Sequence, residues 1–164
     1  MPMNDLKEVY VDQLQDIYSA NVQAVKATKK LQDAAADQGL KDALGAGVTG
    51  FQDGADKIKT LIEGHDADPN GEHCRGMEGL VREAQAHALD EDFGNGETRD
   101  AMIITQYQRM VHYALAAYGC VNAFARRLDA DDDATVIAQL LDDTYEADRN
   151  MTHLATGGIN KAAA

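Results

Sequence analysis

A chain of 164 residues has the length of one domain, in which folding buries roughly 70% of the surface that the unfolded chain exposes. Its net charge of −13 comes from 28 acidic and 15 basic residues, and such a surface repels phosphate backbones and anionic lipid headgroups. We therefore expect neither nucleic acid nor a membrane as a partner. The sequence has no apolar run near the ~20 residues that span a bilayer, and its N-terminal segment lacks the order of a signal peptide, so we expect a cytoplasmic protein.

Two long helices are predicted in the first part of the chain. Apolar residues recur three or four positions apart from Leu6 to Leu31, which is the period of one helix face. Gln38-Gly39 marks the predicted end of this helix, because glycine commonly follows a helix C-terminus. The same period then runs from Leu40 to Ile62. Several glycines each weaken this second helix by ~1 kcal/mol relative to alanine, so they indicate either close contact with another backbone or local mobility: Gly45, Gly47, Gly50 and Gly54.

A loop and a short helix follow in the middle of the chain. Residues 64–76 are rich in Gly, Asp, Asn and Pro, which predicts a loop. Apolar residues from Met77 to Ala84 predict a short helix that continues to about Leu89. After turn-rich residues 90–96, Thr98 is the apparent N-cap of the next helix.

Two further long helices complete the predicted set. One apolar stripe runs from Ile103 to Leu128, and another runs from Val136 to Leu154, toward Gly157-Gly158. The acidic run 129–133 lies between them, at the expected N-terminus of the last helix, where the helix dipole favours carboxylates.

Four long helices and one short helix, with no competing strand pattern, predict an all-α fold. The expected architecture is a four-helix bundle with a short additional helix between the second and third bundle helices. Residues 1–160 would form this single domain, and residues 161–164 would be a frayed C-terminal tail.

The cysteines and several histidines carry no recognisable catalytic or zinc spacing. Cys74 and Cys120 are far apart in the sequence, and we expect both to pack as buried thiols. His65, His73 and His87 lie in or beside the loop-rich middle, where we expect solvated side chains.

Polar residues interrupt the apolar stripes and could point toward one central site. Asn21, Gln52, His112 and Thr144 have an ordinary interpretation as hydrogen-bonded or boundary residues of a helix seam. Asp148 is the sharper candidate, because a buried carboxylate costs several kcal/mol unless it is paired. It could equally be solvated or hydrogen-bonded to a tyrosine.

Four segments show a resemblance to a known family. The opening LKEVYVDQLQDIYSAN is similar to a DxYxAE helix, CRGMEGLVREA to a cysteine-containing loop followed by EGLxxEA, VHYALAAYG to EHYExxxYG, and LLDDTYEAD to LxEExxAD. In this order, and over nearly the whole chain, they resemble the YciF family of bacterial stress-response proteins, a branch of the ferritin-like superfamily. The resemblance implies a ferritin-like bundle and a symmetric homodimer.

Ferritin-like proteins that bind two metals use carboxylates and histidines from four helices. The positions that match those ligands here are mostly neutral: Asn21, Thr49, Gln52, Val111, Ala114, Asp143 and Thr144. A di-iron site needs roughly four carboxylates to balance two hard cations, so we expect no catalytic residue, no cofactor and a degenerate metal centre. The weak candidate ligands that remain are Asn21, Gln52, His112, Asp143 and Asp148.

Three functions remain open at this point. The leading hypothesis is a non-enzymatic, stress-associated scaffold that forms a homodimer. The alternative is a metal-binding oxidoreductase or iron-storage-type protein that holds iron or manganese in an altered site in the bundle core. A helical interaction module, with an acidic surface that engages a basic protein partner, is the third.

Overall fold

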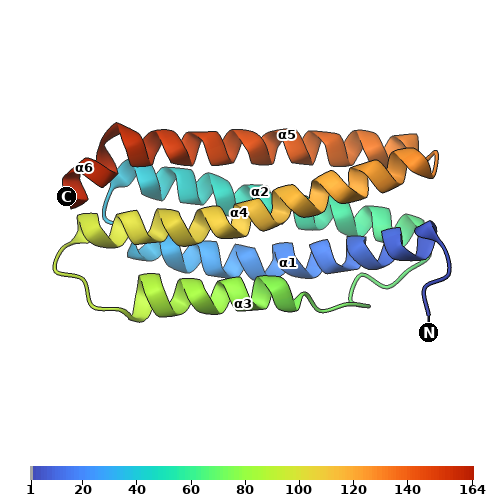
Figure 1. The fold of residues 1–164 in the computed structure, drawn as a ribbon, viewed down its shortest axis with the longest axis horizontal. Helices are drawn as coiled ribbons and strands as arrows, with labels where there is room; N and C mark the ends of the chain where they lie inside the picture. The colour runs from blue at the N-terminus through green and yellow to red at the C-terminus, as the bar shows by residue number, and fades with distance from the viewer. Residues whose placement is uncertain (1) are drawn as a thin grey trace.

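The protein is a bundle of helices, described over residues 2–164 by a computed structural model (Figure 1). Within these residues there is no strand. The long helices are α1 (Leu6–Ala34), α2 (Gln38–Gly64), α4 (Gly96–Arg127) and α5 (Asp131–Leu154). The short helix α3 (Arg75–Ala84) continues into a π-helical turn, η1 (Gln85–Asp90), and α5 continues through η2 (Ala155–Ile159) into α6 (Asn160–Ala163). The predicted four-helix bundle with an additional short helix is confirmed.

Each long helix packs against two others. α1 contacts α2 and α4, and α5 contacts the same two helices from the opposite side. Neighbouring long helices run antiparallel, so α2 and α4 share one direction, and the chain returns along the bundle between them through α3 (Figure 1). α3 itself covers the seam between α1 and α4.

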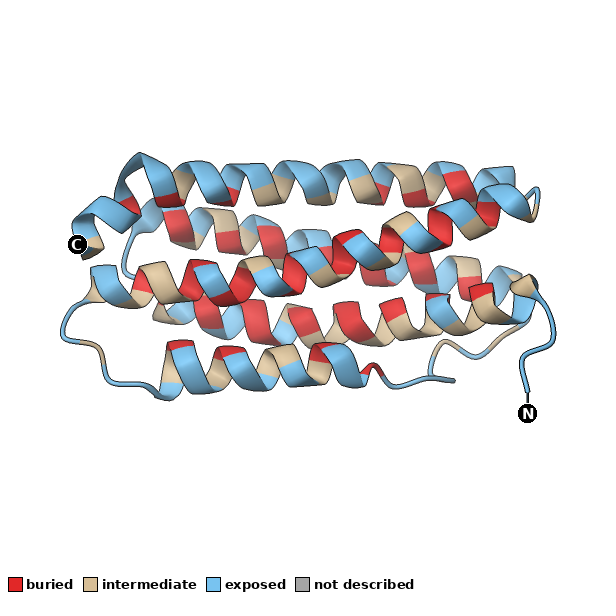
Figure 2. Cartoon of the chain, viewed as in Figure 1, coloured by how far each residue is buried: buried red, intermediate tan, exposed pale blue. Residues whose placement is uncertain are grey.

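Aliphatic side chains and several tyrosines fill the interior of this chain, which contains no tryptophan. The buried residues lie on the inward faces of the helices (Figure 2). Leu14, Leu44, Ile58, Met110 and Ile137 have no solvent-exposed surface. Burial of each such side chain contributes about 1.5–3 kcal/mol relative to its exposure, and helix packing therefore supplies most of the stability.

The link between α1 and α2 differs from the prediction. Gln38-Gly39 does not end the first helix but forms the first turn of α2. The carboxylate of Asp37 caps α2 by accepting a 2.8 Å hydrogen bond from the backbone N–H of Leu40. Aspartate is among the favoured N-cap residues, and this cap starts α2 before the glycine.

A buried carboxylate holds the same link against α4. Asp100 is only 2% exposed, and its two oxygens accept the backbone N–H groups of Ala36 and Asp37 at 2.8 and 2.7 Å. These bonds satisfy backbone donors that have no partner within a helix. Asp100 therefore fixes the position of the α1–α2 link at one end of the bundle.

The start of α4 also differs from expectation. The N-cap of α4 is Asn95, whose side chain accepts from the backbone N–H of Thr98 at 2.9 Å, so the cap lies three residues before the predicted one. Gly157-Gly158 lies inside η2, where the backbone leaves the helical conformation and kinks at Gly158, and the short helix α6 follows to Ala163. Fraying of residues 161–164 remains a prediction. Among the described helices, none is long and apolar enough to cross a membrane.

Candidate functional site

Asn21 lies in the centre of the bundle, as its place on the apolar stripe suggested. It is 1% exposed, and its side-chain amide donates a 2.8 Å hydrogen bond to the hydroxyl of Tyr118 on α4. On α2, a Cβ at Gly54 would lie 2.5 Å from that hydroxyl and 2.9 Å from the Asn21 amide nitrogen. Three helices, α1, α2 and α4, therefore meet at this hydrogen-bonded pair. Only a glycine at position 54 leaves room for the pair.

The remaining glycines of α2 have different surroundings. A Cβ at Gly47 would overlap the hydroxyl of Tyr107, whereas a Cβ at Gly50 would meet nothing within 4 Å. Close approach of buried tyrosines, rather than of another backbone, thus accounts for Gly47 and Gly54.

Gln52 and Thr49 do not reach the core, so Gln52 does not point toward a central polar site. Both residues are exposed. The Gln52 amide donates to Asp56 at 3.1 Å, and the Thr49 hydroxyl donates to the carbonyl of Gly45 at 3.3 Å. The inward face of α2 at this level consists of Phe51 and Gly54, which turns Gln52 outward.

His112 and Asp148 form a pair on the α4–α5 seam. His112 Nε2 lies 2.9 Å from an Asp148 carboxylate oxygen, which also accepts from the Gln108 amide at 3.2 Å. The His112 side chain is 61% exposed and that of Asp148 is 19% exposed. Asp148 is therefore partnered on the α4–α5 seam by His112 and Gln108, and not by a tyrosine.

Asp143 lies apart from the other candidates. It is exposed on α5 and accepts a 2.8 Å hydrogen bond from the Gln139 amide. Among the five candidate ligands, only His112 and Asp148 contact each other through a hydrogen bond. Within residues 2–164 no three His, Cys, Asp or Glu side chains form a group suited to a metal ion.

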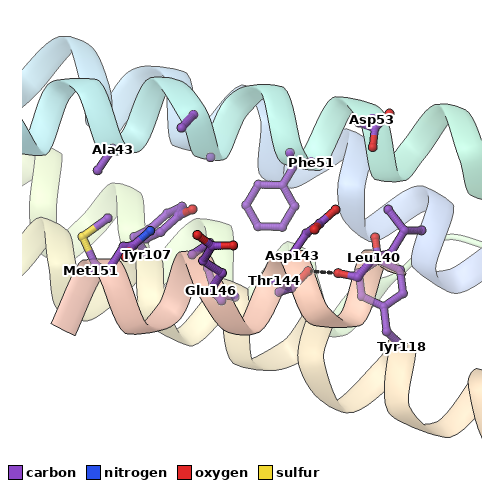
Figure 3. A pocket seen from close by; sticks show the side chains of 16 residues that line it. Ala43, Phe51, Asp53, Tyr107, Tyr118, Leu140, Asp143, Thr144, Glu146 and Met151 are labelled. Atoms are coloured by element: carbon purple, nitrogen blue, oxygen red, sulfur yellow. Dashed lines mark hydrogen bonds between the residues drawn. The ribbon is translucent and has the colours of Figure 1, made fainter. Parts of the chain in front are cut away.

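A groove of about 280 Å³ runs between α2 and α5, with α4 beneath it (Figure 3). Its floor includes Phe51 from α2 and Tyr107, Val111 and Tyr118 from α4. Carboxylates stand along its rim: Asp53 on α2, and Asp143 and Glu146 on α5. Sequence reasoning missed this groove, although its glycines and its α5 carboxylates are visible in the sequence.

Besides Asp143 on the rim, two positions that the resemblance matches to metal ligands border this groove, Val111 and Thr144. The Thr144 hydroxyl donates to the backbone carbonyl of Leu140 at 2.6 Å, the dashed line in Figure 3. Its polar group is thus satisfied by its own helix, and neither side chain offers a carboxylate.

The two tyrosines of the groove floor are neutral phenols at physiological pH. Burial raises the pKa of Tyr107 to about 12, with a smaller contribution from the charge of Asp148. Burial likewise raises the pKa of Tyr118 to about 12, although the hydrogen bond from Asn21 acts in the opposite direction. Phe51 and Tyr107 meet edge to face, with ring centroids 6.3 Å apart.

A second polar cluster surrounds Cys74, at the start of α3. Its sulfur accepts the backbone N–H of Met77 at 3.3 Å and lies 3.0 Å from the Tyr113 hydroxyl, which donates to Asp16 at 2.8 Å. Because Tyr113 gives its hydrogen to Asp16, the thiol donates to Tyr113. Burial raises the pKa of Cys74, and the protonated thiol anchors α3 to α1 and α4.

Cys120 and His65 do not follow the sequence expectation. Cys120 is exposed on α4 rather than buried. His65 is not freely solvated, because its Nε2 lies 2.8 Å from an Asp133 oxygen that also accepts from the Tyr10 hydroxyl at 2.8 Å. Asp133 opens α5 and Tyr10 belongs to α1, so this cluster ties the ends of α1, α2 and α5 together.

Comparison with known proteins gives consistent relatives. A family model described as a domain of unknown function, DUF892, matches residues 5–164. Protein YciF of Escherichia coli strain K12 is 29% identical over 164 residues, which cover 99% of this chain and 98% of that protein.

Two solved structures share the fold. The crystal structure of the E. coli stress protein YciF superposes with a TM-score of 0.87 at 28% identity, covering 97% of this chain and 99% of the other. The structure of YcfI from Rhodopseudomonas palustris gives a TM-score of 0.84 at 25% identity, with coverages of 91% and 94%. These coverages extend the resemblance seen in short segments to nearly the full length.

Proposed function

This chain belongs to the DUF892 family, and on that premise we propose that it is a ferritin-like, stress-associated protein that acts as a non-enzymatic homodimeric scaffold with a degenerate di-metal centre. The similarity to the E. coli stress protein YciF supports the association with stress. YcfI, described as a candidate structural protein, supports a scaffold role.

The hydrogen bond of Asn21 is the main support for the proposal of a degenerate metal centre. Asn21, which stands where the resemblance places a glutamate ligand, uses its amide to bond Tyr118 within the bundle. Val111 and Ala114 replace two further carboxylates, and both are buried apolar residues. Hard cations such as Fe²⁺ and Mn²⁺ need several anionic oxygen ligands, and these positions supply none.

The alternative, a metal-binding oxidoreductase or iron-storage-type protein, requires the remaining polar candidates to act together. His112 and Asp148 are adjacent, but Asn21 is in the core and Gln52 is on the opposite face of α2 from it. The charge and placement of these side chains favour the scaffold.

A turnover assay tests the proposal. Purified protein supplied with Fe²⁺ and either oxygen or hydrogen peroxide should oxidise iron no faster than a buffer control. Multiple turnovers per chain would contradict the non-enzymatic role. The dimer requires a separate measurement, because a chain that sediments only as a monomer at micromolar concentration would refute the scaffold's proposed symmetry.

A further inference from the structure

The groove between α2 and α5 is bordered by a largely buried tyrosine whose hydroxyl is open to the groove. Tyr107 is 2% exposed, and within residues 2–164 its hydroxyl has no hydrogen-bond partner. The missing Cβ of Gly47 makes room for this hydroxyl, which borders the groove (Figure 3). The hydroxyl is open to the groove and is not tied to another side chain, so it leaves a hydrogen-bonding position for a ligand.

The negative charge along the rim of the groove favours a cationic ligand. Asp53 is balanced by Lys57, whose ammonium lies 2.7 Å away. Asp143 receives only the neutral amide of Gln139, and Glu146 has no ion pair among the described residues. No lysine or arginine is among the described residues that line the groove. Two carboxylates of α5 are therefore available to ammonium groups.

The shape of the groove selects an elongated ligand. Its lining extends from Ala43 to Asp53 on α2 and from Leu140 to Met151 on α5, which corresponds to about 15 Å at 1.5 Å per helical residue. Phe51 lies in the middle of this length, while Tyr107 and Tyr118 lie on either side of it (Figure 3). Aromatic and methyl-bearing surfaces suit methylene chains, and aromatic faces also attract cations.

We propose that this groove binds a linear aliphatic polyamine, with its ammonium groups at Glu146 and Asp143, its methylene chain against Phe51, and one ammonium donating to the Tyr107 hydroxyl. Asp143 and Glu146 lie about one helical turn apart on α5, so charge-assisted hydrogen bonds to their carboxylates hold two neighbouring ammonium groups, and the apolar floor favours a methylene chain over a compact hydrated cation. This inference does not depend on the proposed scaffold role, but it shares Asp143 with the candidate metal ligands, so a metal ion held there would compete with the polyamine.

Isothermal titration calorimetry with spermidine tests the proposal at about 0.15 M salt, where the Debye length of ~8 Å suppresses general attraction to the acidic surface. One spermidine should bind per chain. Hexaamminecobalt(III) carries a similar positive charge without a methylene chain and should bind at least tenfold more weakly. Equal affinity for the compact ion, or no saturable binding of spermidine, would overturn the proposal.

Matched variants locate the site. The double variant Asp143→Asn, Glu146→Gln should weaken spermidine binding at least tenfold. Asp142→Asn, Glu91→Gln removes the same charge at exposed positions outside the groove and should change the affinity less than twofold. An equal loss in both double variants would mean that spermidine senses only the net charge, which contradicts the proposal.

Two further variants probe the groove itself. Gly50→Leu fills open space on the groove lining and should abolish binding, whereas Gly79→Leu, on the exposed face of α3, should leave it unchanged. Tyr107→Phe should weaken binding several-fold with an unchanged circular dichroism spectrum. Wild-type affinity in Gly50→Leu would place spermidine elsewhere and refute the assignment.

Discussion

The amide of Asn21 donates a 2.8 Å hydrogen bond to the hydroxyl of Tyr118 at the centre of the bundle. The two residues lie on α1 and α4, and both are almost completely buried. Both side chains are neutral, so the pair needs no metal ion to balance its charge. We expect this hydrogen bond to contribute to the stability of the bundle.

A double-mutant cycle measures that contribution. Tyr118→Phe should lower the free energy of unfolding by about 1–3 kcal/mol, because it leaves the buried Asn21 amide without its acceptor. Asn21→Leu combined with Tyr118→Phe should be less destabilising than the sum of the two single changes, by about 1 kcal/mol. Urea denaturation of the four proteins gives the coupling energy, and strict additivity would mean that the bond contributes nothing.

The glycines of α2 should respond in opposite directions to alanine. Gly54→Ala places a methyl group within 2.5 Å of the Tyr118 hydroxyl and 2.9 Å of the Asn21 amide, so it should be destabilising. Gly50→Ala meets nothing within 4 Å and should stabilise the protein by about 0.5–1 kcal/mol through helix propensity. Thermal unfolding of both variants checks this contrast, which equal shifts of the midpoint would disprove.

Alkaline pH should unfold the protein through its buried tyrosines. Burial raises the pKa of Tyr10, Tyr107, Tyr113 and Tyr118. Because the pKa in the folded state lies above the unfolded value of about 10, their contribution to stability is fully present below about pH 10 and is lost as the pH rises above it. The ultraviolet absorbance of these ionised tyrosines should appear together with the loss of helical circular dichroism. Ionisation of all six tyrosines in a folded protein would contradict this.

The two cysteines should differ in reactivity. Cys74 is completely buried and has a raised pKa, whereas Cys120 is exposed. The thiolate is the reactive form, so a disulfide-exchange reagent should modify one thiol per native chain quickly and the second only after denaturation. Cys120→Ser should remove the fast phase, and a fast phase that survives this change would show that Cys74 is accessible.

The helices were predictable because their apolar residues repeat with the helical period over many turns. The helix ends were harder to predict, because more than one nearby residue could mark each end. Asp37 caps α2 although Gly39 indicated a helix end, and Asn95 caps α4 although Thr98 was an equally suitable cap. The buried position of Asn21 could be predicted because Asn21 interrupts the apolar stripe of its helix. Gln52 was misplaced because one helical position, 100° of rotation, separates it from Phe51.

The contacts between distant segments could not be obtained from periodicity. Asp148 contacts His112 and does not point into the core. Asp133 contacts both Tyr10 on α1 and His65 at the end of α2. Such partners depend on the rotation of each helix about its axis, which the apolar pattern fixes only to within a residue. The groove likewise arises from small residues on α2 opposite larger ones on α5, a property of the pair of helices.

Metal content tests the central claim most directly. After exposure to excess Fe²⁺ or Mn²⁺ and desalting, elemental analysis of the purified protein should find well below two metal ions per chain. The reason is charge balance, since Asn21, Val111 and Thr144 provide no anionic ligand where the resemblance places carboxylates. Two tightly held ions per chain, retained by wild type and lost in Asp148→Asn, would contradict the degenerate centre and favour the oxidoreductase alternative.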